Sequence, residues 1–363
     1  MSKRKQSFLL VFTLALILVG CSTLGVEAPG GDAVQVTDST GHTVTLNELP
    51  ERAAIAGKAT VMVQDAVFLF EAAEERVAAL ENRRQSAFGF LPVVVPNFEE
   101  KEFFEMNAGP EQIAAVNPDL VIMKNFLRES LGSSLESLDI PVLYLNLEKP
   151  EVFYQDITAL GEVFGNPERA EEINSYYQER VEKVQDLTAD LEEGEKPSVL
   201  ILEHSDRGGE VAFSVPPVSW LQTTMVEMAG GRPIWKDLEA SGGWTVVTVD
   251  QIASWDPDQI YILDYQGQAE KVTKELAADD LWSNLRAVKN DQLFAFAFDF
   301  YSWDQPDTRW ILGLQWLTTK IHPELAEQID ILDEVDQFYQ TLYRMDQETI
   351  EAEVVPKLTG DLP

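Results

Sequence analysis

A short sequence motif occurs twice in this chain of 363 residues. Residues 111–122 read EQIAAVNPDLVI, and residues 250–261 read DQIASWDPDQIY. Each copy has an acidic residue before Gln-Ile-Ala, and Pro-Asp before an apolar run. Because proline disfavours helix at the residue before it, each copy predicts a helix that passes into a buried strand. The copies begin 139 residues apart, about one domain length, which predicts two similar α/β lobes with a ligand cleft between them.

The first 21 residues have the features of a lipoprotein signal peptide. Three basic residues, Lys3, Arg4 and Lys5, precede an apolar stretch that is too short for a comfortable transmembrane helix. The stretch ends in Leu-Val-Gly-Cys21, which resembles a bacterial lipobox. We therefore expect acyl chains on Cys21, the only cysteine, to hold the protein on a membrane, with an ordinary signal peptide as the alternative. Residues 22–33 are then a flexible tether.

The charge of the chain restricts its partners. The formal net charge is −35, and the first 20 residues hold three basic residues and no acidic one, so the mature chain carries −38. Such a surface repels phosphates, which argues against a nucleic-acid partner. No segment after residue 20 is apolar for 18 residues, so we expect no membrane span in the mature chain.

Alternating strand and helix patterns predict a first lobe over residues 34–165. A hairpin at 35–46 is followed by strands at 53–56, 77–80, 120–123 and 142–145, with helices at 61–76, 111–116 and 134–138. A long helix is expected over 166–194, where Asn166 caps and Pro167 opens it. It extends for roughly 40 Å. The spacing leaves open whether this helix connects the lobes or lies on the surface of the first.

A second lobe is predicted over residues 195–363. Its strands are expected at 198–203, 259–263 and 293–298, and its helices at 220–228, 251–255 and 308–321. Asp304, two residues before Pro306, is expected to fix the loop before the last of these helices, and Arg309 to bond to that loop or pair with an acid. The tail from Asp346 is acidic and is expected to be peripheral.

Several segments, in order along the chain, resemble the periplasmic-binding-protein family that delivers iron–siderophore complexes, haem and cobalamin to ABC importers. They are the lipobox, the hairpin at 38–46, PEQIAAVNPDLVI at 110–122, LGEVFGNPERAEEI at 160–173, Gly230-Gly231, the aromatic loop before 306–314, and His-Pro-Glu at 322–324. The resemblance implies two Rossmann-like α/β lobes joined by one long helix, with limited hinge motion because a helix bends little.

The same resemblance implies a role for the acid that opens each copy of the motif. In this family a carboxylate on each lobe docks against arginines of the membrane permease, and the matching positions are Glu111 and Asp250. Glutamate is usual at the second position, and aspartate is one methylene shorter. An acid in the first turn of a helix also favours the helix dipole by about 0.3–1 kcal/mol without any partner.

Candidate ligand residues are those predicted to follow the strands, because ligands of open α/β sheets lie beyond the carboxyl ends of the strands. They are Lys58, Arg83, Arg84, Lys124, His204, Arg207, Trp244, Tyr301 and Trp303. The bases indicate an anion site or salt bridges, and the aromatic rings indicate stacking on a ligand or a place in the core. His204 is expected to have an ordinary polar role in its loop, with contact to a metal complex as the alternative. No bare-metal site or cofactor is expected, because such sites take several His or Cys ligands.

The resulting functional hypothesis is a lipid-anchored, extracytoplasmic, monomeric substrate-binding component of an ABC importer. It captures a metal chelate, with an iron–siderophore complex favoured, and delivers it to the permease and its ATPase. Molybdate or tungstate, and cobalamin or haem, are alternative ligands. A surface-anchored α/β hydrolase is the distant alternative, and the absence of a Gly-x-Ser-x-Gly elbow from the sequence argues against it.

Overall fold

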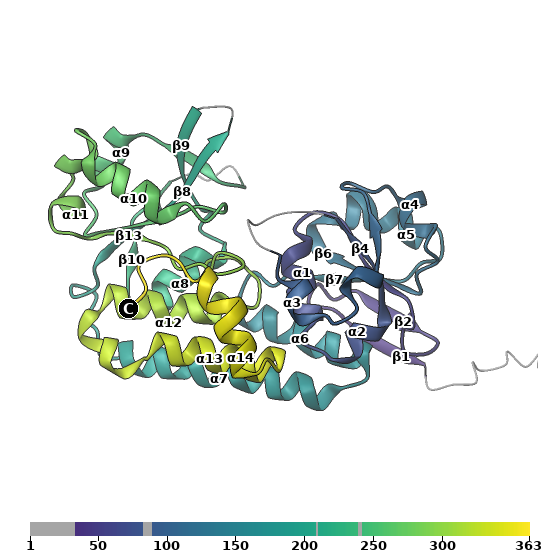
Figure 1. Cartoon of the computed structure of the whole chain (residues 1–363). Helices are drawn as coiled ribbons and strands as arrows, with labels where there is room; N and C mark the ends of the chain where they lie inside the picture. The colour runs from purple at the N-terminus through teal and green to yellow at the C-terminus, as the bar shows by residue number, and fades with distance from the viewer. Residues whose placement is uncertain (1–32, 83–88, 208–209, 239–241) are drawn as a thin grey trace, which may run out of the picture.

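The chain folds into two lobes, each with a central β-sheet. A computed structural model describes residues 33–82, 89–207, 210–238 and 242–363. The lobe formed by the first half of the chain lies on the right of Figure 1, and the other lies on the left. One sheet has five strands and the other has six. The prediction of an α/β chain with two lobes is therefore confirmed.

The sheet of the first lobe is wholly parallel, in the strand order β5-β4-β3-β6-β7. Its strands are β3 (Ala53–Ile55), β4 (Val77–Glu81), β5 (Glu102–Phe104), β6 (Leu120–Lys124) and β7 (Val142–Leu145). Every residue of β3, β6 and β7 is buried, as expected of parallel strands that are covered on both faces. Four of the five strands lie within one residue of their predicted bounds, and β5 was not predicted.

The helices of the first lobe are short. They are α1 (Thr60–Val67), α2 (Ala72–Arg76), α3 (Leu91–Val94), α4 (Pro110–Ala114) and α5 (Ser133–Glu136). The predicted hairpin is confirmed as β1 (Val34–Thr37) paired antiparallel with β2 (Thr43–Leu46). Its turn is held by Asp38 Oδ1, which accepts hydrogen bonds from the backbone N–H groups of Thr40 and His42. The hairpin packs against α6.

Two long helices follow the first lobe. α6 (Pro150–Phe164) was not predicted, and it ends at Gly165, whose φ of 70° lies in the left-handed region that favours glycine. α7 (Pro167–Thr188) begins as predicted, because Asn166 Oδ1 accepts a hydrogen bond from Arg169 N–H. It contacts α6 on one side, and α8 and α12 of the second lobe on the other, as a connecting helix does (Figure 1). It ends at Thr188, before the predicted end at residue 194, and the side chain of Leu191 beyond it lies close to Gly230 of the second lobe.

The sheet of the second lobe is mixed. Its order is β11-β9-β8-β12-β13, and β10 pairs with β8. The strands are β8 (Ser198–Arg207), β9 (Glu210–Val215), β10 (Arg232–Pro233), β11 (Thr245–Val247), β12 (Gln259–Leu263) and β13 (Leu293–Ala295). The prediction of a loop at 204–207 is wrong, because these residues continue β8 and pair antiparallel with β9.

The remaining helices cover the second sheet and the base of the molecule. They are α8 (Leu221–Met228), α9 (Val249–Trp255), α10 (Ala269–Ala278), α11 (Arg286–Lys289), α12 (Trp310–Ile321), α13 (Ile331–Tyr343) and α14 (Gln347–Thr349). The tail is not peripheral as predicted, because Ile350 and Val354 are buried and Thr359 bridges to Phe298. No helix within the described ranges is long and apolar enough to cross a membrane.

The two copies of the repeated motif fold alike, as helix α4 before β6 and helix α9 before β12. Each helix is followed by a residue of positive φ ahead of Pro-Asp, 49° at Asn117 and 47° at Asp256. Each Asp then binds the backbone near the start of a neighbouring strand. Asp119 accepts from the N–H groups of Glu51 and Arg52, and Asp258 accepts from the N–H of Ser198. The shared Pro-Asp therefore joins each helix–strand unit to the next strand.

Candidate functional site

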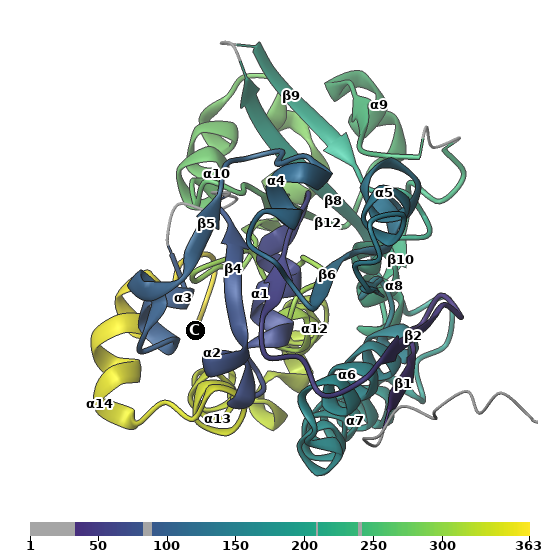
Figure 2. The same ribbon diagram turned by 90° about the vertical axis from the view of Figure 1, so that its right-hand side faces the viewer.

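The acid that opens each motif lies on the surface, at the start of its helix. Glu111 is the second residue of α4, and Asp250 is the second residue of α9. Both side chains are exposed, and neither makes a salt bridge within the described part of the chain. In Figures 1 and 2, α4 and α9 both lie toward the upper edge of the molecule, one on each lobe, away from α7 and α13 at its base. The two helices that begin with these acids therefore lie on the same side of the protein.

The loop between β13 and α12 lies at the carboxyl end of the second sheet and carries two of the predicted aromatic residues. Trp303 is fully buried, and its Nε1 donates to Asp299 Oδ2 over 3.1 Å. Tyr301 is only 4% exposed. Both rings are therefore part of the core in this conformation, and Trp303 offers no surface on which a ligand could stack. Of the two predicted roles for Tyr301 and Trp303, the structure therefore favours a place in the core over stacking on a ligand.

Three other aromatic residues of the second lobe are partly exposed, and their rings lie together. Trp220 precedes α8, Trp244 precedes β11, and Tyr265 follows β12. The ring centroids of Trp220 and Trp244 are 5.7 Å apart, and those of Trp244 and Tyr265 are 6.3 Å apart. We call these three residues the aromatic patch. Trp244 was predicted as a site residue, whereas Trp220 was interpreted only as the start of a helix.

A buried polar network around Asp304 holds Tyr265 of the patch. Asp304 Oδ2 accepts hydrogen bonds from Gln222 Nε2, Tyr265 Oη and Gln305 Nε2, each over 2.9 Å. Burial raises the pKa of Asp304, although these hydrogen bonds oppose the change. The expectation that Asp304 fixes its loop is confirmed. The network also links α8, the loop after β12 and the loop before α12, and Tyr265 is the residue of the patch that it bonds directly.

His204 lies in β8 beside the loop that carries Tyr265. Its Nδ1 is 2.8 Å from Asp264 Oδ2, and the side chain is 12% exposed. Asp264 Oδ1 accepts from the backbone N–H groups of Gln266 and Gln268. Burial opposes ionisation of Asp264, but the hydrogen bonds from His204 and from this backbone lower its pKa. A carboxylate held in this way orients the imidazole and directs Nε2 away from the pair.

The predicted basic residues occupy different environments. Lys58 follows β3 and is exposed. Lys124 is the last residue of β6 and is 1% exposed, with Nζ bonded to the carbonyl of Asn146 and 3.2 Å from Glu148. Burial lowers the pKa of Lys124. Lys124 therefore serves the core of the first lobe rather than an open surface. Arg83 and Arg84 lie outside the described residues, as does the side chain of Arg207, whose backbone ends β8.

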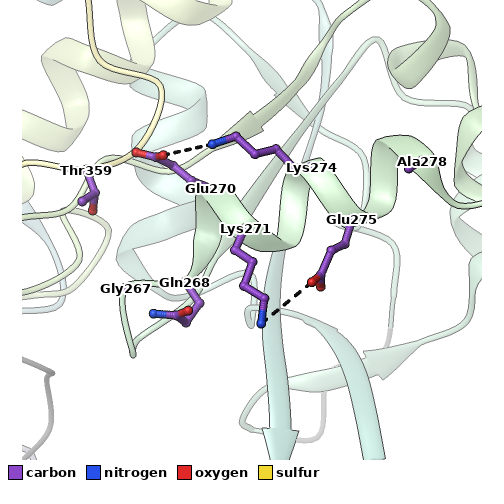
Figure 3. A pocket seen from close by; sticks show the side chains of 8 residues that line it. All are labelled: Gly267, Gln268, Glu270, Lys271, Lys274, Glu275, Ala278 and Thr359. Carbon is purple, nitrogen blue, oxygen red and sulfur yellow. Dashed lines mark hydrogen bonds and ion pairs between the residues drawn. The ribbon is translucent and has the colours of Figure 1, made fainter.

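The described surface also has a hollow of about 630 Å³ along α10. Figure 3 shows the eight residues that line it, which are Gly267, Gln268, Glu270, Lys271, Lys274, Glu275, Ala278 and Thr359. Lys271 Nζ is 3.8 Å from Glu275, and Lys274 Nζ is 3.4 Å from Glu270. Each lysine is thus neutralised by a glutamate of its own helix. Among the described residues, no group of three or more His, Cys, Asp or Glu side chains is arranged to hold a metal ion.

Comparison with known sequences gives one family match. The model of a family described as periplasmic binding protein matches residues 43–299. The molybdate-binding protein MolA of Haemophilus influenzae is 21% identical over 330 residues, which cover 85% of this chain and 90% of that protein. The high-affinity heme uptake system protein IsdE of Staphylococcus aureus is 22% identical over 193 residues, covering 52% of this chain and 63% of that one.

Comparison with solved structures agrees on the fold. A periplasmic solute binding protein from Veillonella parvula superposes with a TM-score of 0.72 at 24% identity, covering 89% of this chain and 97% of that one. The molybdate-bound structure of MolA superposes with a TM-score of 0.70 at 19% identity, covering 86% and 98%. At these identities the structures establish the fold alone.

Proposed function

This chain belongs to the periplasmic binding protein family, and we propose that it captures a metal chelate, with an iron–siderophore complex favoured, for delivery to an ABC permease. The family match covers well over half of the chain. The chain is a substrate-binding protein of the ABC-importer type and not an enzyme. The choice of ligand, the docking surface and the membrane anchor are proposals.

The aromatic patch supports a ligand with an organic surface. Trp220, Trp244 and Tyr265 are partly exposed residues from three segments, and Asp304 holds Tyr265 in place. Covering apolar surface is worth about 25 cal/mol for each Å², so a ligand with flat or apolar faces gains affinity from the rings. A bare oxyanion, which needs N–H and guanidinium donors, gains little from them. This patch is the observation that carries the preference for a chelate.

His204 is our proposed contact to the metal of the chelate. Because Asp264 engages Nδ1, the other ring nitrogen is the one left for a metal or a ligand oxygen. The anionic groups of a chelate are assigned to Lys58, Arg83, Arg84 and Arg207, which all follow or end strands of the two sheets. Lys124 and Trp303 are buried, so they are proposed to support the site through the core and not to contact the ligand. Tyr301 is nearly buried and is proposed to act mainly in the same way.

Molybdate is the second candidate ligand, because MolA is named as a molybdate-binding protein and matches most of this chain. Haem is a further candidate, since IsdE is named for heme uptake, and cobalamin and tungstate follow from the same family resemblance. An oxyanion would depend on Lys58 and the arginines and would be indifferent to the aromatic patch. A chelate, haem or a corrinoid would depend on the patch.

Titration calorimetry of the mature protein separates these ligands. We expect binding of a ferric chelate, and we expect Trp244→Ala to weaken it by roughly tenfold or more, as loss of a buried aromatic contact does. The matched control is Trp255→Ala, which removes a partly exposed tryptophan at the opposite, amino-terminal end of β12. Binding of molybdate with equal affinity in the wild type and Trp244→Ala would favour the oxyanion. The proposed function would be refuted if no ferric chelate, oxyanion, haem or corrinoid gave a heat of binding.

Delivery to the permease and its ATPase is assigned to Glu111 and Asp250, the exposed acids that begin two helices on the same side of the protein. Cys21 lies outside the described residues. Its acylation would anchor the protein to the outer face of the cytoplasmic membrane. We propose that the anchored protein is a monomer. Cys21→Ser should move the protein from the detergent phase to the aqueous phase in a two-phase extraction. An unchanged distribution would refute the lipid anchor while leaving ligand binding unaffected.

A further inference from the structure

A buried ionic cluster crosses from one lobe to the other. Arg309, just before α12 of the second lobe, is fully buried and bonds to Asp65 in α1 of the first lobe, with Nη1 2.5 Å from Oδ2. Arg309 also bonds to two carboxylates of its own loop. Asp299 Oδ1 lies 2.7 Å from Nε, and Asp307 Oδ2 lies 3.1 Å from Nη1. These four residues form what we call the interlobe cluster.

Aromatic and polar groups from both lobes seal the cluster. The ring of Phe90, from the first lobe, lies 4.4 Å from the guanidinium carbon of Arg309 and contacts the rings of Phe300 and Tyr343. Tyr343 Oη donates to the carbonyl of Asp65 over 3.0 Å. At the rim, Arg169 and Arg344 both donate to the carbonyl of Leu69. The lobes thus meet in a desolvated contact between α1 of the first lobe and the loop before α12 and α13 of the second.

The charges of the interlobe cluster do not balance when every carboxyl is ionised. Three carboxylates then face one guanidinium in a site from which water is excluded, and a buried charge without a partner is costly. Burial raises the pKa of Asp307 to about 8 and that of Asp65 to about 6. The neighbouring carboxylates add to this rise, and the positive charge of Arg309 opposes it. The cluster therefore keeps protons that exposed aspartates would release.

The other titratable groups around the cluster do not change charge in this pH range. They are Tyr177 on α7, Tyr301 on the loop, and Tyr339 and Tyr343 on α13, and burial raises the pKa of each well above its usual value. Burial opposes the charge of Arg309, but Tyr339 and the carboxylates keep its pKa high. Asp304 bonds within the second lobe, where burial also raises its pKa. Proton exchange at the contact is thus set by Asp65 and Asp307.

We propose that the interlobe cluster is a proton-holding clamp, which fixes the first lobe to the second and tightens as the surroundings become more acidic. When the lobes are together, the two carboxyls bind protons that they lose when the lobes separate and water reaches them. Contact between the lobes is therefore favoured below the raised pKa values and weakened as the pH rises through 6 to 8. This clamp is independent of which ligand the protein binds.

Hydrogen–deuterium exchange of the mature protein tests the clamp, with rates corrected for the pH dependence of intrinsic exchange. Peptides from α1 and α13 report on the contact, and peptides from β6 and β12 report on the interior of each lobe. We expect protection of α1 and α13 to fall by roughly a thousandfold between pH 5.5 and 8.5, about tenfold for each pH unit below the pKa of Asp307 and a further few-fold from Asp65. Protection of β6 and β12 should stay nearly constant.

Asp307→Asn gives the decisive comparison, because asparagine is uncharged at every pH and keeps an oxygen for the Arg309 N–H. In this variant, the loss of protection at α1 and α13 between pH 5.5 and 8.5 should shrink to a few-fold. The matched control is Asp156→Asn, since burial raises the pKa of Asp156 to about 6 but its bonds stay within the first lobe. The control should keep the full fall at α1 and α13. A flat profile in the wild type, an unchanged fall in Asp307→Asn, or an equal fall in β6 and β12 would overturn the clamp.

Discussion

The two copies of the repeated motif share a scaffold and differ at their first residues. In both, a short helix is followed by a residue of positive φ, then by Pro-Asp and a fully buried strand. The helix starts differ. Gly109 offers no side-chain cap before Glu111, whereas Thr248 accepts a hydrogen bond from Gln251 N–H beside Asp250. The comparison teaches that the shared body builds the lobes, while the surface acids are free to serve another protein.

The lobes that surround the two copies have diverged further. The first sheet is wholly parallel, whereas the second has an antiparallel hairpin, β8–β9, that carries His204. The aromatic patch also belongs entirely to the second lobe. In the proposed function the aromatic contacts therefore come from the second lobe, whereas the basic contacts come from both, with Lys58 in the first lobe and Arg207 in the second.

The largest expected effect on stability tests the equivalence of the two helices. Ile113 and Ile252 occupy the same position of the motif and are fully buried. Each Ile→Ala change should lower the free energy of unfolding by about 2–5 kcal/mol, because it removes buried methyl groups and leaves a cavity. Urea denaturation gives the values. A large loss at one position and none at the other would break the comparison.

A smaller effect is expected at the aspartates of Pro-Asp. Asp119→Ala and Asp258→Ala each leave backbone N–H groups at the start of a strand without their acceptor, at a cost of about 1–2 kcal/mol. Hydrogen bonds from Ser198 and Arg286 outweigh burial and lower the pKa of Asp258, so its contribution is present above pH 3.8 and is lost as the pH falls through the lowered value. Asp186→Ala, on the surface of α7, is the control and should change stability by no more than about 0.5 kcal/mol.

The repeated motif also shows what the sequence could and could not predict. Local patterns placed β3, β4, β6, β7 and β12 within one residue, because buried strands have continuous apolar runs. His204 was placed in a loop, since antiparallel pairing with β9 is a tertiary contact that extends β8 beyond its apolar run. Lys124 was taken as a candidate for an anion site or a salt bridge, and Trp303 was left between ligand stacking and the core, because their burial depends on segments distant in sequence. Trp220 was missed because its ring neighbour, Trp244, lies 24 residues away.

The smallest expected effect concerns the one methylene by which the motif acids differ. Asp250→Glu should change the uptake rate by no more than about fivefold, as should Glu111→Asp, because exposed ion pairs are worth about 0–1 kcal/mol each. Uptake of labelled ligand at subsaturating concentration gives both values. We expect the longer side chain to be the better one at each position. A loss of more than a hundredfold from either change would mean that docking needs one defined length.

The central claim is that Glu111 and Asp250 act on the permease and not on the fold or the ligand. The most direct test measures uptake and ligand affinity in the same double variant, Glu111→Lys with Asp250→Lys. Its control is Glu151→Lys with Glu168→Lys, which reverses two exposed glutamates that each follow a helix-opening proline, as Glu111 does. The account predicts that the first pair abolishes uptake with unchanged ligand affinity, while the control transports normally. Lost ligand affinity in the first variant, or normal uptake by it, would contradict the claim.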